Sequence, residues 1–115
     1  MRTIRVAART ALSADAAFDR ISGLGNEWTV PFRGKSIHWR QQCETAPGKR
    51  RLSFTQTAGD FRNMSGAWQT TPTPEGCEVL LELTYDIGVP IYDRILDSLV
   101  ERALADFVRM TVSRW

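Results

Sequence analysis

Aromatic and amide side chains recur two residues apart in this sequence, and they are the groups best suited to binding chemistry. Trp39, Gln41 and Cys43 share one face of an alternating segment, and Tyr85 ends another. Aromatic rings stack on flat conjugated molecules, and a positioned polar group can polarise a carbonyl. The pattern predicts a surface for a flat apolar ligand, with Gln41 and Tyr85 as candidate catalytic groups. The predicted ligand-binding side chains are Trp28, Phe32, Trp39, Cys43, Phe54, Gln56, Met64, Trp68 and Phe107.

The same aromatic face also fits a plain hydrophobic core, and this alternative stays open. Gln41 and Gln56 lie on otherwise apolar faces, where an unpaired buried amide costs about 1–3 kcal/mol. Their partners would be a ligand, a bound water, or each other across neighbouring strands. Cys43 has no base nearby in sequence, which favours an inert thiol. His38 and Arg40 fall on the opposite face, so we expect them at the surface unless a β-bulge turns them inward.

Composition excludes several classes of function. The 115 residues include one histidine, so no zinc-ligand spacing exists, and no phosphate-binding loop is present. We therefore expect no metal and no cofactor. The net charge of +2 and scattered basic residues disfavour nucleic-acid binding. No apolar run approaches the roughly 20 residues of a membrane span, and no signal peptide is evident, which predicts a cytoplasmic protein without membrane insertion.

The hydrophobic spacing predicts the elements that would position these groups. Period-two alternation predicts strands near residues 2–8, 28–32, 37–43, 52–56, 64–68 and 79–85, with a loop over 72–76. Ser13 is a candidate N-cap for a helix that ends at Gly23 or Gly25. A long C-terminal helix should follow Gly88 and Pro90. Its predicted apolar stripe is Ile91, Ile95, Leu99, Ala103, Phe107 and Met110, widened by Leu96, Val100, Leu104 and Val108. This order indicates one α+β domain over residues 1–115, an antiparallel sheet curled around the last helix with an apolar cavity between them.

Three segments carry a resemblance to a known family, and the resemblance extends over most of the chain. They are residues 53–68 (SFTQTAGDFRNMSGAW), residues 85–88 (YDIG) and residues 101–104 (ERAL). They are similar to the polyketide cyclase/dehydrase and coenzyme Q-binding branch of the START-like (SRPBCC) superfamily. The resemblance implies a helix-grip fold, a curved antiparallel sheet wrapped around a long C-terminal helix, and it matches Met64 to a cavity methionine.

The resemblance also implies a function, with alternatives. The first is a polyketide cyclase/aromatase-like protein of secondary metabolism that binds a polyketide intermediate, tethered to an acyl carrier protein, and promotes aldol cyclisation and dehydration. The second is a non-catalytic carrier of a quinone, lipid or other apolar molecule. The third is an interaction module with a filled interior, in which exposed apolar surface could drive homodimerisation.

Two departures from the family pattern bear on these alternatives. Gln41 and Cys43 stand where aromatase/cyclase members carry a serine and an arginine, which favours the carrier. The chain also looks shortened between residues 24 and 26, where family members usually have a further helix and strand.

Overall fold

The computed structural model describes residues 2–32, 34–86 and 93–115, and the side chains of residues 35, 47 and 93–97 lie outside that description. The elements, in order, are β1 (Arg2–Thr10), α1 (Ala14–Ser22), β2 (Glu27–Phe32), β3 (Lys35–Ala46), the short 3-10 helix η1 (Pro47–Lys49), β4 (Arg51–Gly59), β5 (Asn63–Thr73), β6 (Gly76–Asp86) and α2 (Asp93–Ser113). The predicted alternation of strands and helices is confirmed. The expected break at Gly88 and Pro90 lies outside the described residues.

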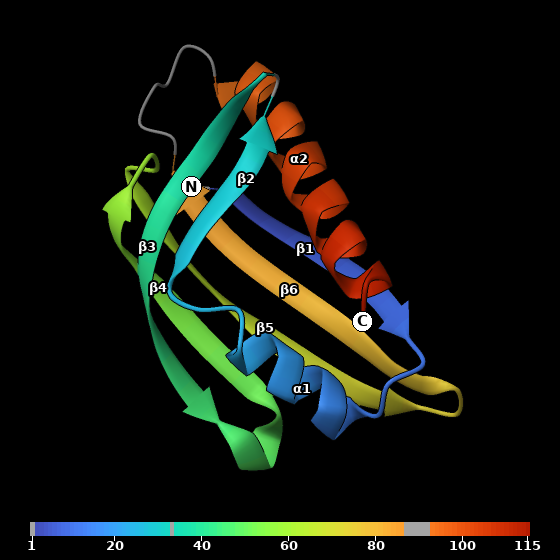
Figure 1. Cartoon of the computed structure of the whole chain (residues 1–115). Coiled ribbons are helices and arrows are strands. Elements are labelled where there is room, and N and C mark those ends of the chain that lie inside the picture. Colours follow the sequence, from blue (N-terminus) through green and yellow to red (C-terminus); the bar gives the residue numbers. More distant parts are fainter. Residues whose placement is uncertain (1, 33, 87–92) are drawn as a thin grey trace.

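The strands form one curved antiparallel sheet, six strands wide, in the order β1-β6-β5-β4-β3-β2. α2 contacts mainly the two edge strands, β1 and β2, so it spans the open side of the curl (Figure 1). α1 packs on β5 and β6 near the other end of the sheet (Figure 1). The hydrophobic core fills the space between the inner sheet face and the two helices. The predicted helix-grip fold is confirmed.

The β5–β6 connection is tighter than the sequence suggested. β5 continues to Thr73 and β6 begins at Gly76, so the predicted loop over residues 72–76 is wrong at both ends. Pro72 lies in the ladder opposite Cys77. There β5 has only β6 beside it, because pairing with β4 stops at Gln69, and an edge position tolerates a residue without an N–H.

A β-bulge interrupts the pairing of β3 with β4. The register shifts between Arg40 and Gln41 and leaves Thr57 of β4 without an opposite residue. The Thr57 hydroxyl donates to the Arg40 carbonyl at 3.4 Å. Because the extra residue is on β4, alternation along β3 continues, with Trp39 and Gln41 buried and Arg40 exposed. The bulge therefore leaves the inner face of β3 as predicted.

A local cap and one tertiary hydrogen bond hold α1 in place. The Ser13 hydroxyl accepts a hydrogen bond from the Ala16 N–H at 3.1 Å, which confirms the predicted N-cap. The Thr70 hydroxyl, buried on β5, donates to the Ala14 carbonyl at 2.9 Å. Together these contacts fix the first turn of α1 against the sheet.

α2 is rotated relative to the expected stripe. The side chains buried against the sheet follow each other at intervals of four: Val100, Leu104, Val108 and Val112. Leu99, Ala103 and Phe107 are half-buried, and Met110 is 41% exposed, so its predicted place in the stripe is wrong. Stripe residues 91, 95 and 96 lie outside the described side chains. Neither helix, as far as it is described, is long and apolar enough to cross a membrane.

Candidate functional site

An aromatic cluster occupies the space between the inner sheet face and α2. Trp28 of β2 and Trp39 of β3 are opposite each other in the ladder, and their rings stack with centroids 5.8 Å apart and planes 5° apart. Trp68 stacks on Trp28 from another strand, at 5.8 Å and 30°. Phe107 of α2 meets Trp28 edge-on, at 5.4 Å and 64°. Such pairs stabilise by about 0.5–1.5 kcal/mol beyond their buried area, so the rings hold one another in defined places.

The cavity inside this cluster is very small. Its volume is about 10 Å³, which is room for about one water molecule. The lining side chains are Trp28, Trp39, Gln41, Phe54, Trp68, Leu81, Leu83, Leu104, Phe107 and Val108. The expectation of a ligand-sized cavity is therefore wrong for this structure. The physical reason is that the aromatic rings themselves fill the curl of the sheet.

Gln41 is the polar aliphatic side chain among the described residues that line the cavity. It is 6% exposed, and its Oε1 accepts a hydrogen bond from Trp39 Nε1 at 2.8 Å. Its Nε2 donates to Cys43 Sγ at 3.3 Å. An amide does not titrate, so Gln41 can orient and polarise a carbonyl but cannot act as a general base.

Two buried polar atoms have no hydrogen-bond partner among the described residues: Trp28 Nε1 and Gln56 Oε1. Gln56 Nε2 donates to the Phe61 carbonyl at 2.9 Å. Gln41 and Gln56 are opposite each other in the β3–β4 ladder, but their side chains bond elsewhere. The cross-strand amide pair considered from the sequence does not form.

The remaining predicted residues, the candidate catalytic Tyr85 and the ligand-binding candidates Phe32, Cys43, Gln56 and Met64, are not among the side chains that line the cavity. Met64 and Tyr85 are buried on the same inner face, and the Tyr85 ring packs on Phe61 at 5.3 Å and 51°. Cys43 borders a shallow polar depression between β3 and β4. Phe32 borders a surface groove between β2 and α2 with a volume of about 220 Å³.

Phe61 is a site residue that sequence reasoning missed. Its ring packs on both Trp39 and Tyr85, at 5.7 Å and 5.3 Å, and joins the aromatic cluster to the end of the sheet. It follows the Gly59-Asp60 turn, where no periodicity applies. The single available signal was a large apolar residue in an otherwise polar turn.

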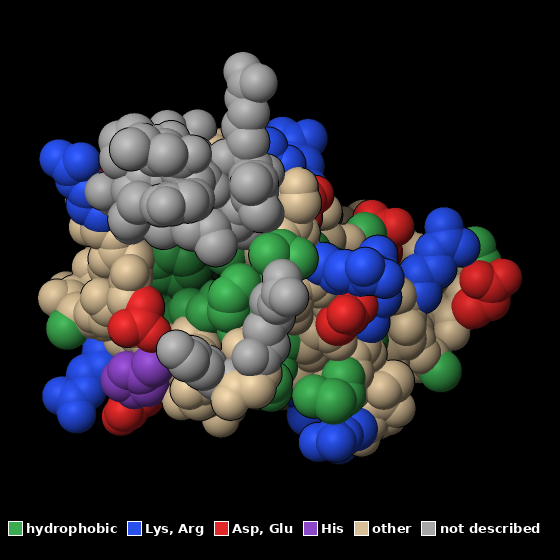
Figure 2. Space-filling view, turned by 90° about the horizontal axis from the view of Figure 1, so that it is seen from above, with side chains coloured by type: hydrophobic (Ala, Val, Ile, Leu, Met, Phe, Trp, Pro, Cys, Tyr) green, Lys and Arg blue, Asp and Glu red, His purple; other side chains and the backbone are tan. Residues whose placement is uncertain are grey.

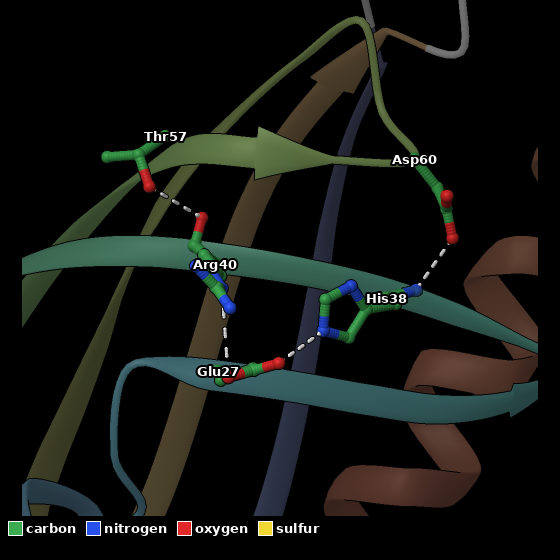
Figure 3. A network of polar contacts seen from close by, with 5 residues as sticks. All are labelled: Glu27, His38, Arg40, Thr57 and Asp60. Carbon is green, nitrogen blue, oxygen red and sulfur yellow. Dashed lines mark hydrogen bonds and ion pairs between the residues drawn. The ribbon is translucent and has the colours of Figure 1, made fainter.

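The outer face of the same strands carries a polar network (Figure 3). His38 Nε2 lies 2.8 Å from Glu27 Oε1, and Arg40 Nε lies 3.7 Å from Glu27 Oε2. The hydrogen bond with His38, and then the charge of Arg40, hold the pKa of Glu27 below its usual 4.5. The Asp60 carboxylate accepts from the His38 backbone N–H at 2.8 Å, which ties the β4–β5 turn to β3. The predicted outward positions of His38 and Arg40 are confirmed.

Viewed from above, hydrophobic side chains lie in a recess beside His38 and its acidic neighbours (Figure 2). The polar network thus borders one end of the apolar interior. Among the described residues, no group of three or more histidine, cysteine or acidic side chains could hold a metal ion. Cys43 and Cys77 are both free thiols, and burial raises the pKa of Cys77.

Comparison with known proteins places this geometry in a family. The family described as polyketide cyclase/dehydrase and lipid transport matches residues 4–111. No curated protein sequence matches the chain.

Solved structures share the fold at low sequence identity. TTHA0849 from Thermus thermophilus has a TM-score of 0.81 at 21% identity, over 97% of this chain and 92% of that one. A START superfamily protein from Mycobacterium smegmatis has a TM-score of 0.74 at 14% identity, over 97% of both chains. The Zhui aromatase/cyclase from Streptomyces sp. R1128 has a TM-score of 0.71 at 14% identity, over 91% of this chain and 88% of that one. With the family match covering nearly the whole sequence, the chain belongs to the polyketide cyclase/dehydrase and lipid transport family.

Proposed function

We propose that this protein binds a flat, apolar polyketide intermediate against its aromatic cluster and promotes aldol cyclisation and dehydration. The observation that carries the proposal is a cavity wall of stacked tryptophans with one amide, Gln41, among them. The family match and the fold shared with an aromatase/cyclase support it. In this proposal the protein acts in the cytoplasm, on a substrate tethered to an acyl carrier protein.

Aldol cyclisation requires mainly that the two reacting carbon atoms be held in the right orientation. In an aldol closure an enol carbon attacks a ketone carbon, the enol O–H gives up a proton as its carbonyl re-forms, and the ketone oxygen takes up a proton to become a hydroxyl. In the dehydration this hydroxyl leaves as water with a hydrogen from the adjacent carbon, and a C=C bond forms. Holding the two carbons together in the right geometry supplies much of the rate enhancement. Gln41 uses one amide N–H on Cys43, and its second N–H can donate to the reacting carbonyl oxygen. Tyr85 is buried outside the cavity lining, so Gln41 is the stronger candidate of the two.

The proposal requires the interior to open. A cavity of about 10 Å³ cannot hold a polyketide, so a ligand must displace a side chain of the cluster. Phe107 is best placed to move, because it is half-buried and comes from α2, which touches the sheet mainly at its two edge strands. Rotation of this ring away from Trp28 would extend the cavity along the helix.

The test is product analysis with a minimal polyketide synthase that supplies a carrier-bound poly-β-ketone. We expect the protein to shift the products toward one ring pattern, and Gln41→Leu to weaken the shift at least tenfold. Thr29→Ala, an exposed change on the outer face of β2, serves as the control. An identical product distribution with and without the protein would reject the cyclase proposal.

A second candidate is a non-catalytic carrier of a quinone, lipid or similar apolar molecule. It is favoured by the cavity lining, which contains no titratable side chain among the described residues. Native mass spectrometry of the purified protein would then reveal a co-purified ligand. Absence of any bound molecule, together with no uptake of a polycyclic dye, would contradict the carrier.

A further inference from the structure

Trp28 carries a hydrogen-bond donor that the fold buries and does not use. The side chain is 7% exposed, and Nε1 has no acceptor among the described residues. The contrast with Trp39 is direct, because that indole N–H donates to Gln41 at 2.8 Å. An unsatisfied buried donor weakens the folded state, and because the Trp28 side chain lines the cavity, a molecule bound there would offer the acceptor that the described residues lack.

The chemistry around Trp28 restricts what that acceptor can be. No charged residue lines the cavity among the described side chains. A carboxylate or phosphate would be buried there without a counter-charge, which is strongly unfavourable. A neutral oxygen acceptor avoids this cost.

A water molecule is a weaker candidate than a carbonyl oxygen. A buried water needs two to four polar partners, and the lining offers the Trp28 indole and the Gln41 amide. Gln41 has one amide N–H left after its bonds to Trp39 and Cys43, so a water there would reach only the lower limit of two partners. A ketone oxygen is satisfied by a single donor, and its flat aromatic body can replace the ring contacts that open around Trp28.

We propose that Trp28 Nε1 is the hydrogen-bond donor that selects neutral, ketone-bearing aromatic ligands over hydrocarbons and over acids. This inference rests on the proposed function, because it assumes that the aromatic cluster opens to a ligand. It names a specificity-determining residue and a ligand class: flat, uncharged, with a carbonyl oxygen at one edge.

The test compares fluorene with fluorenone, two flat molecules of similar shape that differ by one carbonyl. Equilibrium dialysis of the full chain measures both affinities. We expect fluorenone to bind about tenfold tighter than fluorene, as one buried hydrogen bond predicts. Trp28→Phe should bring the ratio close to one while fluorene still binds. Trp115→Phe, a tryptophan outside the cavity lining, is the matched control and should keep the ratio.

A second measurement does not depend on the variant folding. Infrared spectra of fluorenone bound to the wild-type chain should show the carbonyl stretch at lower frequency than in an alkane solvent. Equal affinities for the two molecules, a ratio that survives Trp28→Phe, or an unshifted carbonyl stretch would each overturn the role of Trp28. If neither molecule binds, the opening of the aromatic cluster is wrong, and the proposed function fails with it.

Discussion

Removing the Phe107 ring should open a cavity in the filled interior that is large enough to bind a small aromatic molecule. The ring packs edge-on against Trp28 and lines the void of about 10 Å³. Phe107→Ala leaves the backbone of α2 intact, since alanine is the best helix former. The space of the ring then joins the existing void.

The expected loss of stability follows from burial. Replacing a fully buried phenylalanine by alanine costs about 3–5 kcal/mol, as lost transfer energy plus the cavity left behind. Phe107 is half-buried, so we expect about 2 kcal/mol. For a domain of this size, that corresponds to a melting temperature lower by roughly 10 °C. An apolar cavity on the order of 100 Å³ stays dry and takes up small aromatic molecules.

The assay combines urea unfolding with equilibrium dialysis against fluorene. Met110→Ala is the matched control, because Met110 is exposed on the same helix and should change stability by less than about 0.5 kcal/mol. We expect Phe107→Ala to lose stability and to bind fluorene at least tenfold tighter than the wild type, since the wild type must first displace the ring.

Two results would refute this reasoning. One is a stability loss no larger than that of Met110→Ala, which would mean that the ring contributes little to packing. The other is unchanged fluorene affinity, which would mean that Phe107 does not occupy the ligand's place.

Three further predictions concern other parts of the fold. Gly66→Ala should lower the free energy of unfolding in urea by about 1–3 kcal/mol, because a Cβ there would collide with the β6 backbone. Gly48→Ala is the control, since a Cβ there meets open space and should be nearly neutral. Equal effects of the two substitutions would contradict this prediction. The pKa of Glu27 in the folded protein lies below its usual value of 4.5. The ionised Glu27 carboxylate therefore stabilises the fold above pH 4.5, and this stabilisation is lost as the pH falls through the lowered pKa of the folded state. Carboxyl NMR titration should show this low pKa, and it should rise in His38→Ala; a pKa unmoved by that substitution would exclude the hydrogen bond as its cause. Cys77 is fully buried with a raised pKa, so it should resist alkylation until the protein unfolds, and rapid labelling in the native state, located by peptide mass mapping, would argue against this packing.

Much of the fold follows from local patterns that need no tertiary information. Strand alternation is local, so the shared inner face of Trp39 and Gln41 could be read from the sequence, as could the outward positions of His38 and Arg40. The Ser13 cap likewise depends on a few neighbouring residues. The order of these elements and the family resemblance both indicated the helix-grip arrangement, which the structure confirms.

The sequence predicted most of the side chains that line the cavity, but it did not predict the volume of the cavity. Trp28, Trp39, Gln41, Phe54, Trp68 and Phe107 were expected around the ligand, and all of them line the small cavity. Whether such rings enclose a gap or fill it depends on their rotamers and on the distance from sheet to helix. Period-two spacing carries neither quantity, so the interior could not be sized from the sequence.

Tertiary structure decided three further features. A wide apolar stripe on a 3.6-residue period does not specify which of two adjacent rows faces the sheet, and contact with β1 and β2 places Leu104 inward and Met110 outward. The Gln41 side chain bonds along its own strand to Trp39, although Gln56 is its opposite residue in the ladder. The unused donor of Trp28 exists only in the folded chain, because a buried N–H lacks an acceptor only once the surrounding side chains are in place.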